Sequence, residues 1–160
     1  MAVDMFLKLD SIKGESKQDG HKDEIDVQSW SWGLSNSATA HLGGGSGSGK
    51  VSVQDISFTH FTDSSSPDLL KCCCIGKHIS KGTLVVRKAG GKAIDYIKLE
   101  LEQIMVTNIH NGGSGHDDRL IESVTLNFSK FKYSYAEQTE TGAKGKEGKF
   151  GYDIQQGKEA

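Results

Sequence analysis

The segment from Gly44 to Lys50 comes close to a phosphate-binding loop, which would imply nucleotide chemistry. The P-loop pattern is Gly-x-x-x-x-Gly-Lys followed by Ser or Thr, between a strand and a helix. Gly44, Gly49 and Lys50 match it, but Val51 stands where the hydroxyl that binds Mg²⁺ is needed. Residues Val51 to Asp55 then alternate as in a strand, so no helix N-terminus follows to hold phosphates. We therefore interpret the segment as a glycine-rich loop.

Two further clusters contain residue types that bind metals or act in catalysis. Cys72 to Cys74 are consecutive, and on a helix they project about 100° apart, so they cannot converge as zinc ligands. We interpret them as small apolar residues that pack a helix onto a sheet. His116, Asp117 and Asp118 follow a glycine-rich turn, where Asp commonly satisfies backbone groups. With no nucleophile, base and carboxylate at a recognisable spacing, we expect no enzyme, metal or cofactor.

Two tryptophans alternate with two serines along one expected strand. Trp30 and Trp32 share one face of it, and Ser29 and Ser31 share the other. Exposed tryptophan rings can stack on a base or a sugar, but apolar residues continue this face, so we interpret both rings as core. The serine face is then small and polar, and we expect it to line a smooth, wetted surface.

The composition limits the possible classes of protein. The chain has 160 residues, a formal net charge of −2 and three cysteines, which fits one domain spanning 1–160. Basic residues are spread singly, so we expect neither nucleic-acid binding nor capture by an anionic membrane. No apolar run reaches about 18 residues, and the N-terminus has an acid where a signal peptide carries cations. The adjacent cysteines fit reduced thiols in a cytoplasmic folding environment.

Alternating apolar residues predict a mainly β fold. The apolar phase reverses within the segments 51–58, 99–106 and 126–133. Because side chains alternate with period two, each reversal requires a β-bulge or a strand that passes between two buried environments. Long strands of this kind favour a single-domain β-barrel of two curved antiparallel sheets.

One short helix is expected beside the barrel, at about 66–76. Ser66 is a candidate N-cap, Pro67 a first helical residue, and Gly76 a C-terminal stop. Its expected apolar face contains Leu69, Leu70 and Cys73. A glycine-rich loop is expected at about 35–50.

Blocks of sequence along nearly the whole chain resemble the haemolysin-coregulated protein (Hcp) family of bacterial type VI secretion. They lie in order at 1–8, 13–16, 21–26, 29–33, 53–60, 66–71, 88–90 with 96–98, 123–128 and 149–153. The cysteine triplet and the segment 139–148 lie outside these blocks.

This resemblance implies a β-barrel with one flanking helix that forms the inner tube of a contractile injection apparatus. Six copies would form a ring with an open lumen, and the rings would stack into the tube. The implied partners are further copies of the chain, the spike protein, the sheath and small effector proteins carried and chaperoned in the lumen. Assembly would be cytoplasmic, and the protein would then be secreted without a signal peptide. No membrane insertion and no catalytic activity are implied.

Together, the resemblance and the sequence pattern predict an effector-contacting site and an assembly loop. We expect Ser29 and Ser31 to contact effectors in the lumen. We expect the glycine-rich loop to act in assembly by reaching an adjacent ring or subunit, through Gly43, Gly44, Gly45, Gly47, Gly49 and Lys50. Two other hypotheses stay open: a small-ligand-binding barrel that uses Trp30 and Trp32 as an aromatic pocket, and an enzyme that uses the cysteine or His/Asp clusters.

Overall fold

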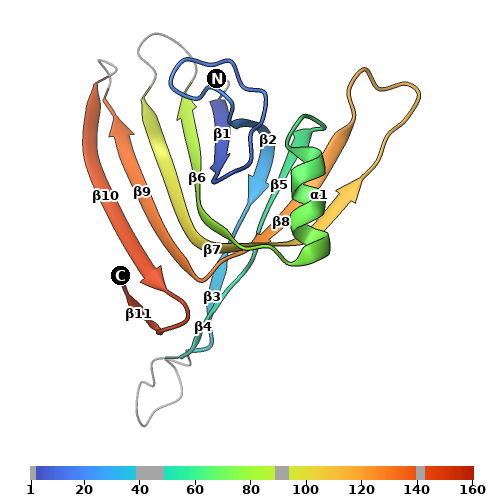
Figure 1. Ribbon diagram of the computed structural model, residues 1–160. Coiled ribbons are helices and arrows are strands. Elements are labelled where there is room, and N and C mark those ends of the chain that lie inside the picture. The colour runs from blue at the N-terminus through green and yellow to red at the C-terminus, as the bar shows by residue number, and fades with distance from the viewer. Residues whose placement is uncertain (1–2, 39–48, 89–93, 140–142) are drawn as a thin grey trace.

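The computed structural model of the chain describes residues 3–38, 49–88, 94–139 and 143–160 and is mostly β-strand with one helix in these ranges (Figure 1). In chain order the elements are β1 Val3–Leu9, β2 Ile25–Ser31, β3 Leu34–Asn36, β4 Val51–Val53, β5 Ile56–Phe61, α1 Ser66–Ile75, β6 Ile79–Lys88, β7 Asp95–Asn111, β8 Ile121–Asn127, β9 Lys130–Gln138, β10 Lys144–Asp153 and β11 Lys158–Glu159.

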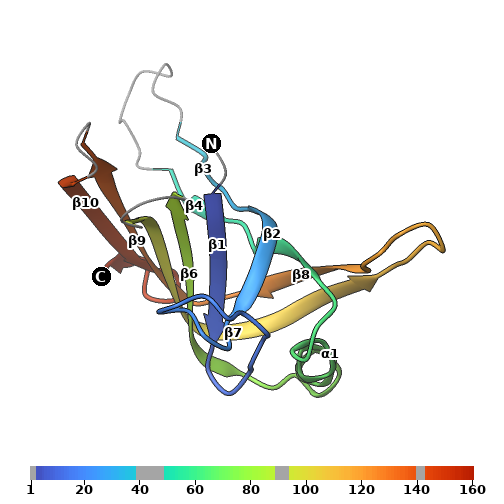
Figure 2. The same ribbon diagram turned by 90° about the horizontal axis from the view of Figure 1, so that it is seen from above.

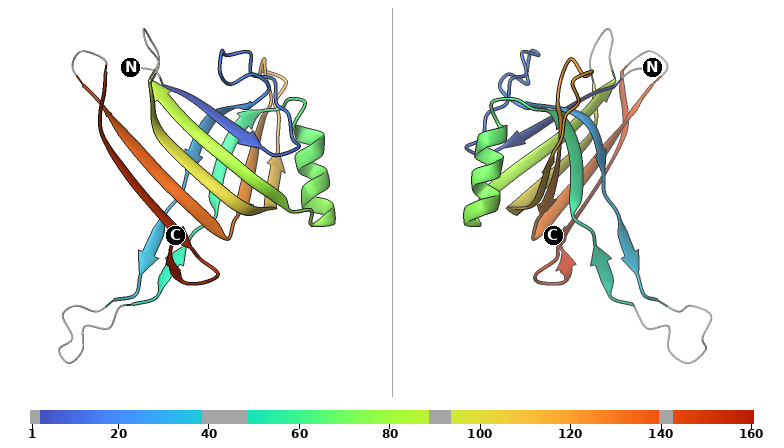
Figure 3. Two further views of the ribbon diagram at one scale, coloured as in Figure 1. Left: turned by 60° about the vertical axis from the view of Figure 1, so that its left-hand side comes forward. Right: turned by 90° about the vertical axis from the view of Figure 1, so that its right-hand side faces the viewer.

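Six antiparallel strands close into a barrel in the order β1, β2, β5, β8, β7, β6 and back to β1. The sheet continues past β7 through β9, β10 and β11, which we call the wing. The hairpin of β3 and β4 projects away from the barrel (Figure 3). The predicted mainly β barrel is confirmed.

Strand β7 explains the predicted phase reversal between 99 and 106. Leu99 and Leu101 are buried before the reversal, and Ile104 and Val106 after it. Between them Gln103 is exposed and has a φ of 56°, in the left-handed region. The first half of β7 pairs with β6 and β9, whereas its second half pairs with β8. The strand therefore passes from one sheet to another at Gln103. Of the two explanations expected from the sequence, this is the strand that passes between two buried environments.

The other two phase reversals, in segments 51–58 and 126–133, arise because each segment contains two separate strands. Residues 54 and 55 separate β4 from β5, which belong to different sheets. Phe128 and Ser129 form the turn between β8 and β9. The expectation of single bent strands at these two places is wrong, because each apparent strand is two strands with their own alternation.

Helix α1 lies outside the barrel beside β7 (Figure 2). Ser65, one residue before the expected Ser66, occupies the N-cap position, and Gly76 ends the helix with a φ of 65°. Leu69 and Cys72 are buried, whereas Leu70 is 40% exposed. The expected apolar face is therefore wrong at Leu70, because positions three apart, 69 and 72, turn toward the sheet.

Candidate functional site: the hydroxyl face of the barrel

Short hydroxyl side chains cover the outer side of three adjacent barrel strands. We call this surface the hydroxyl face: Ser29 and Ser31 of β2, Ser57 and Thr59 of β5, and Ser123 and Thr125 of β8. The strand register aligns them in two rows across the sheet. One row is Ser29, Thr59, Ser123, and the other is Ser31, Ser57, Thr125.

Strand alternation produces this face. The residues between the hydroxyls, such as Phe58 and Val124, point inward and are buried. A register shift between Val27 and Ser29 realigns β2 with β5, so that both serines of β2 face outward. Cross-strand hydrogen bonds order the hydroxyls, at 2.6 Å between Ser29 Oγ and Thr59 Oγ1. The result is a polar, uncharged wall without long side chains.

The two ends of the hydroxyl face differ in chemistry. At one end Asp55 accepts hydrogen bonds from Asn127 Nδ2 at 2.9 Å and Thr107 Oγ1 at 3.2 Å. At the other end Phe61 pairs with Ile121, and the guanidinium of Arg119 stacks 3.9 Å from the Phe61 ring. The hydroxyls therefore lie between a hydrogen-bonded carboxylate, that of Asp55, and a partly apolar, cationic rim.

A buried ionic cluster lies directly behind this face, on the inner side of β5 and β8. His60 Nε2 is 2.8 Å from Glu122 Oε1, and neither side chain is exposed to solvent. His60 Nδ1 is 3.7 Å from Asp63 Oδ2. Asp63 in turn accepts hydrogen bonds from the N–H and the hydroxyl of Ser65, the N-cap of α1. The cluster thus connects two barrel strands to the start of the helix.

The pKa values of this cluster reflect competition between burial and pairing. Burial by itself lowers the pKa of His60, but the carboxylates of Asp63 and Glu122 raise it by more, so that its pKa lies above the ordinary 6.5. Burial raises the pKa of Asp63, but the nearby imidazole of His60 and the hydrogen bonds from Ser65 lower it to a net value below 3.8. Both shifts favour the charged forms, an imidazolium between carboxylates.

The tryptophans lie where the core interpretation places them. Both are half-buried and pack against the core, and the Trp32 ring meets Phe131 edge-on at 4.9 Å. Neither ring lines any of five well-formed cavities in the described part of the chain. The aromatic-pocket hypothesis therefore gains no support.

The glycine-rich segment has the expected strand after it. Val51 begins β4, and Gly49 and Lys50 extend the β3–β4 hairpin through hydrogen bonds with Asn36 and Ser37. A Cβ at Gly49 would collide with the backbone at Ala38 and Ser37, so this close approach requires glycine. Of the other predicted loop residues, Gly43, Gly44, Gly45 and Gly47 lie outside the described residues.

The remaining chemical clusters do not form sites. Cys72 is buried and Cys74 exposed, as divergent helix positions require. In the described ranges no group of three His, Cys, Asp or Glu residues is placed to hold a metal ion. The turn before β8 is held by Ser114, whose hydroxyl accepts from the N–H of His116, rather than by the aspartates as expected.

Sequence reasoning missed four hydroxyls and one ion pair. Ser57, Thr59, Ser123 and Thr125 alternate with apolar residues in two strands, a signal that could have extended the serine face. The sequence does not show the partner of His60, because Glu122 comes opposite it only where β5 and β8 are neighbours. No local pattern joins residues so far apart.

The fold and this face define a class: a closed barrel with an added wing, whose outer side carries a wall of short hydroxyl side chains. The family model described as "Type VI secretion system effector, Hcp" matches residues 6–135. Protein hcp1 of Pseudomonas aeruginosa is 48% identical, with both chains covered in full. The crystal structure of Hcp1 from Salmonella typhimurium is 41% identical over all of both chains, with a TM-score of 0.84. A structure of a type six secretion system protein, 25% identical, has a TM-score of 0.94 over 99% of this chain and all of the other.

This chain belongs to the Hcp family of type VI secretion. In the described part of the chain, no helix is long and apolar enough to cross a membrane.

The ionic cluster predicts a pH dependence of stability. Because the pKa of His60 is higher in the folded protein than its ordinary 6.5, its contribution is fully present below about pH 6.5 and is lost as the pH rises through the folded pKa. Because the pKa of folded Asp63 lies below 3.8, its contribution is lost only as the pH falls through that lower value. We expect the melting temperature to fall between about pH 6 and pH 9, and to fall less in His60→Gln.

Circular dichroism at a fixed protein concentration measures this difference. His110→Gln, which changes an exposed histidine on β7, is the matched control and should follow the unaltered protein. Parallel pH profiles for His60→Gln and the unaltered protein would show that the ion pair does not titrate as described.

Proposed function

We propose that this chain is the structural subunit of the type VI secretion inner tube. Six copies form a ring, the rings stack, and the hydroxyl face lines the lumen, where it carries and chaperones effector proteins. The observation that carries the proposal is this face, whose six short hydroxyls form two aligned rows across three strands. Family membership supports the setting in type VI secretion.

The chemistry of the face suits a carrier of varied proteins. Serine and threonine hydroxyls both donate and accept hydrogen bonds, and so can bind many backbone and side-chain groups. Short side chains lose little conformational freedom when cargo binds. A wall without net charge neither repels nor tightly holds a particular partner, which permits release at the destination.

The proposed partners follow from this role. They are further copies of the chain, the spike protein, the surrounding sheath and the effectors. The protein assembles in the cytoplasm and leaves the cell as part of the tube, without a signal peptide and without catalysis. The glycine-rich loop, carried on the projecting β3–β4 hairpin, reaches an adjacent ring or subunit.

Imaging tests the central proposal. Purified protein at micromolar concentration and physiological salt should give ring particles by electron microscopy, with a native mass of about six subunits, since closed cyclic assembly satisfies every interface. A monodisperse monomer under these conditions would refute the tube assignment.

A bulky residue on the hydroxyl face should impair carrying. We expect Ser31→Trp to reduce effector retention in a pull-down by about tenfold, because the indole obstructs the row formed with Ser57 and Thr125. Ser80→Trp, an exposed serine on β6 outside this face, is the matched control and should retain effectors normally. Equal retention by intact rings of both variants would remove Ser31 from the site.

Shortening the glycine-rich loop should separate assembly from folding. Deleting residues 43–47 should weaken ring stacking or ring closure, while the melting temperature of the subunit stays close to that of the unaltered chain, because long surface loops tolerate length changes. Sedimentation velocity and electron microscopy measure the assembly. Normal tubes from the shortened chain would show that the loop has no role in assembly.

A further inference from the structure

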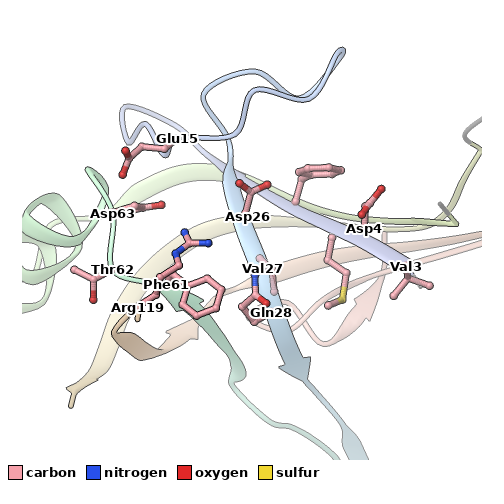
Figure 4. Close-up of a pocket in the computed structure, with 12 residues that line it drawn as sticks. Val3, Asp4, Glu15, Asp26, Val27, Gln28, Phe61, Thr62, Asp63 and Arg119 are labelled. Carbon is pink, nitrogen blue, oxygen red and sulfur yellow. The ribbon is translucent and has the colours of Figure 1, made fainter. Parts of the chain in front are cut away.

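A cleft of about 560 Å³ opens on the barrel surface between the first half of β1 and the first half of β2. Its charged lining consists of Asp4, Glu15, Asp26, Asp63 and Arg119 (Figure 4). We call it the acidic cleft, because among its described lining residues four carboxylates face one guanidinium. Its rim includes Val3, and Phe61 in its lining pairs across the sheet with the half-exposed Ile121.

The cleft exists because two neighbouring barrel strands separate. The register joins β1 to β2 only at Phe6 with Asp26 and at Leu7 with Ile25. On its other side β1 pairs with β6 along its whole length, from Val3 to Leu9. The first residues of β1 therefore lack a strand partner in the described ladder on the cleft side, and an open strand edge is a surface that binds other chains.

The acidic cleft favours a cationic occupant. Burial raises the pKa of Asp26, and the carboxylates of Asp63 and Asp4 raise it further, while Ser16 and Arg119 act in the opposite direction. Glu15 accepts a hydrogen bond from the N–H of Ser64, and Asp63 is engaged by His60 and Ser65. Asp4 and Asp26 are thus the carboxylates left to receive an incoming positive charge.

The chain carries a complementary surface on its wing. Strand β11 pairs with β10 only at Tyr152 and Asp153, so the edge of β10 from Lys144 to Phe150 has no strand partner in the described structure. Lys144 and Lys149 both pair with Glu147, at 3.3 and 3.7 Å. Lys146 is exposed and makes no ion pair with any described residue.

Apolar side chains accompany the charges on both surfaces. Phe150 is 46% exposed beside the β10 lysines, and Ile121 is 50% exposed beside the cleft. Basic and apolar groups on one surface thus match acidic and apolar groups on the other, as interfaces with an apolar centre and charged rim do.

Within one copy the two surfaces cannot meet, because β9, β7 and β6 separate β10 from β1 in the sheet. We propose that the acidic cleft of one copy binds the open β10 edge of a second copy, with Lys146 placed between Asp4 and Asp26. A contact between two different surfaces of identical chains is heterologous, and it closes a ring when the rotation between copies fits. This inference rests on the proposed function, for which it supplies the contact between subunits.

Charge reversal on each side tests the contact. Asp26→Lys and Lys146→Glu should each weaken self-association by about tenfold or more, measured by sedimentation velocity at low salt, because attraction becomes like-charge repulsion. Combining both changes in one chain should restore rings, since the charges are then exchanged. Asp117→Lys and Lys77→Glu, which reverse exposed charges elsewhere, are the matched controls and should assemble normally.

A mixture of the two single variants tests directly whether the cleft of one chain pairs with the β10 edge of the other. The Asp26→Lys chain keeps a working β10 edge, and the Lys146→Glu chain keeps a working cleft. An equimolar mixture should therefore form rings of alternating chains, because one contact keeps the original charges and the next has both charges exchanged. Asp26→Asn, which removes charge without introducing a lysine, should show a weaker loss and serves if Asp26→Lys does not fold.

The outcomes separate this inference from the function on which it rests. Rings that form normally in both single variants overturn the inference alone, and show that the β10 lysines only keep an open edge soluble. A monomeric unaltered chain overturns the proposed function and the inference together. Loss of rings in the single variants with recovery in the combined variant supports both.

Discussion

The fold depends on one strand, β7, because it must complete two sheets at once. Its 17 residues run from Asp95 to Asn111. The first half supports the wing through β9, and the second half closes the barrel through β8. A regular strand cannot change its buried side, so Gln103 takes a left-handed conformation at the crossing. The turn between β8 and β9 is fastened at the same point, since the N–H of Ser129 donates to the carbonyl of Glu102.

The closure of the barrel by β8 produces the hydroxyl face and the ionic cluster together. Strands β5 and β8 are neighbours only in the closed barrel, and their outward positions carry hydroxyls while their inward positions carry His60 and Glu122. A buried ion pair adds little net stability compared with well-packed apolar residues, but breaking it leaves a charge without a partner. We infer that the pair holds the register of the two strands, and with it the alignment of the hydroxyl rows.

The hydroxyl face differs in chemistry from the acidic cleft and the β10 edge. The hydroxyl face offers many weak hydrogen bonds, whereas the acidic cleft and the β10 edge offer charge and open strand edges at two separate places. The proposed cargo face and the proposed contact between copies are different physical requirements. The acidic cleft shares β2 and β5 with the hydroxyl face, whereas the β10 edge lies in the wing.

The sequence by itself determined the local features. The alternation of apolar residues placed most strands, Pro67 and Gly76 bounded the helix within a residue, and Val51 excluded a phosphate loop, because backbone preferences act over a few residues. Only the tertiary structure decided which strands are neighbours. Ser29 meets Thr59, and His60 meets Glu122 across 62 positions of sequence, through a register that closure of the whole barrel imposes. In the described residues the topology also left part of the β1 edge beside β2, and most of the outer edge of β10, without a strand partner, which no local pattern encodes.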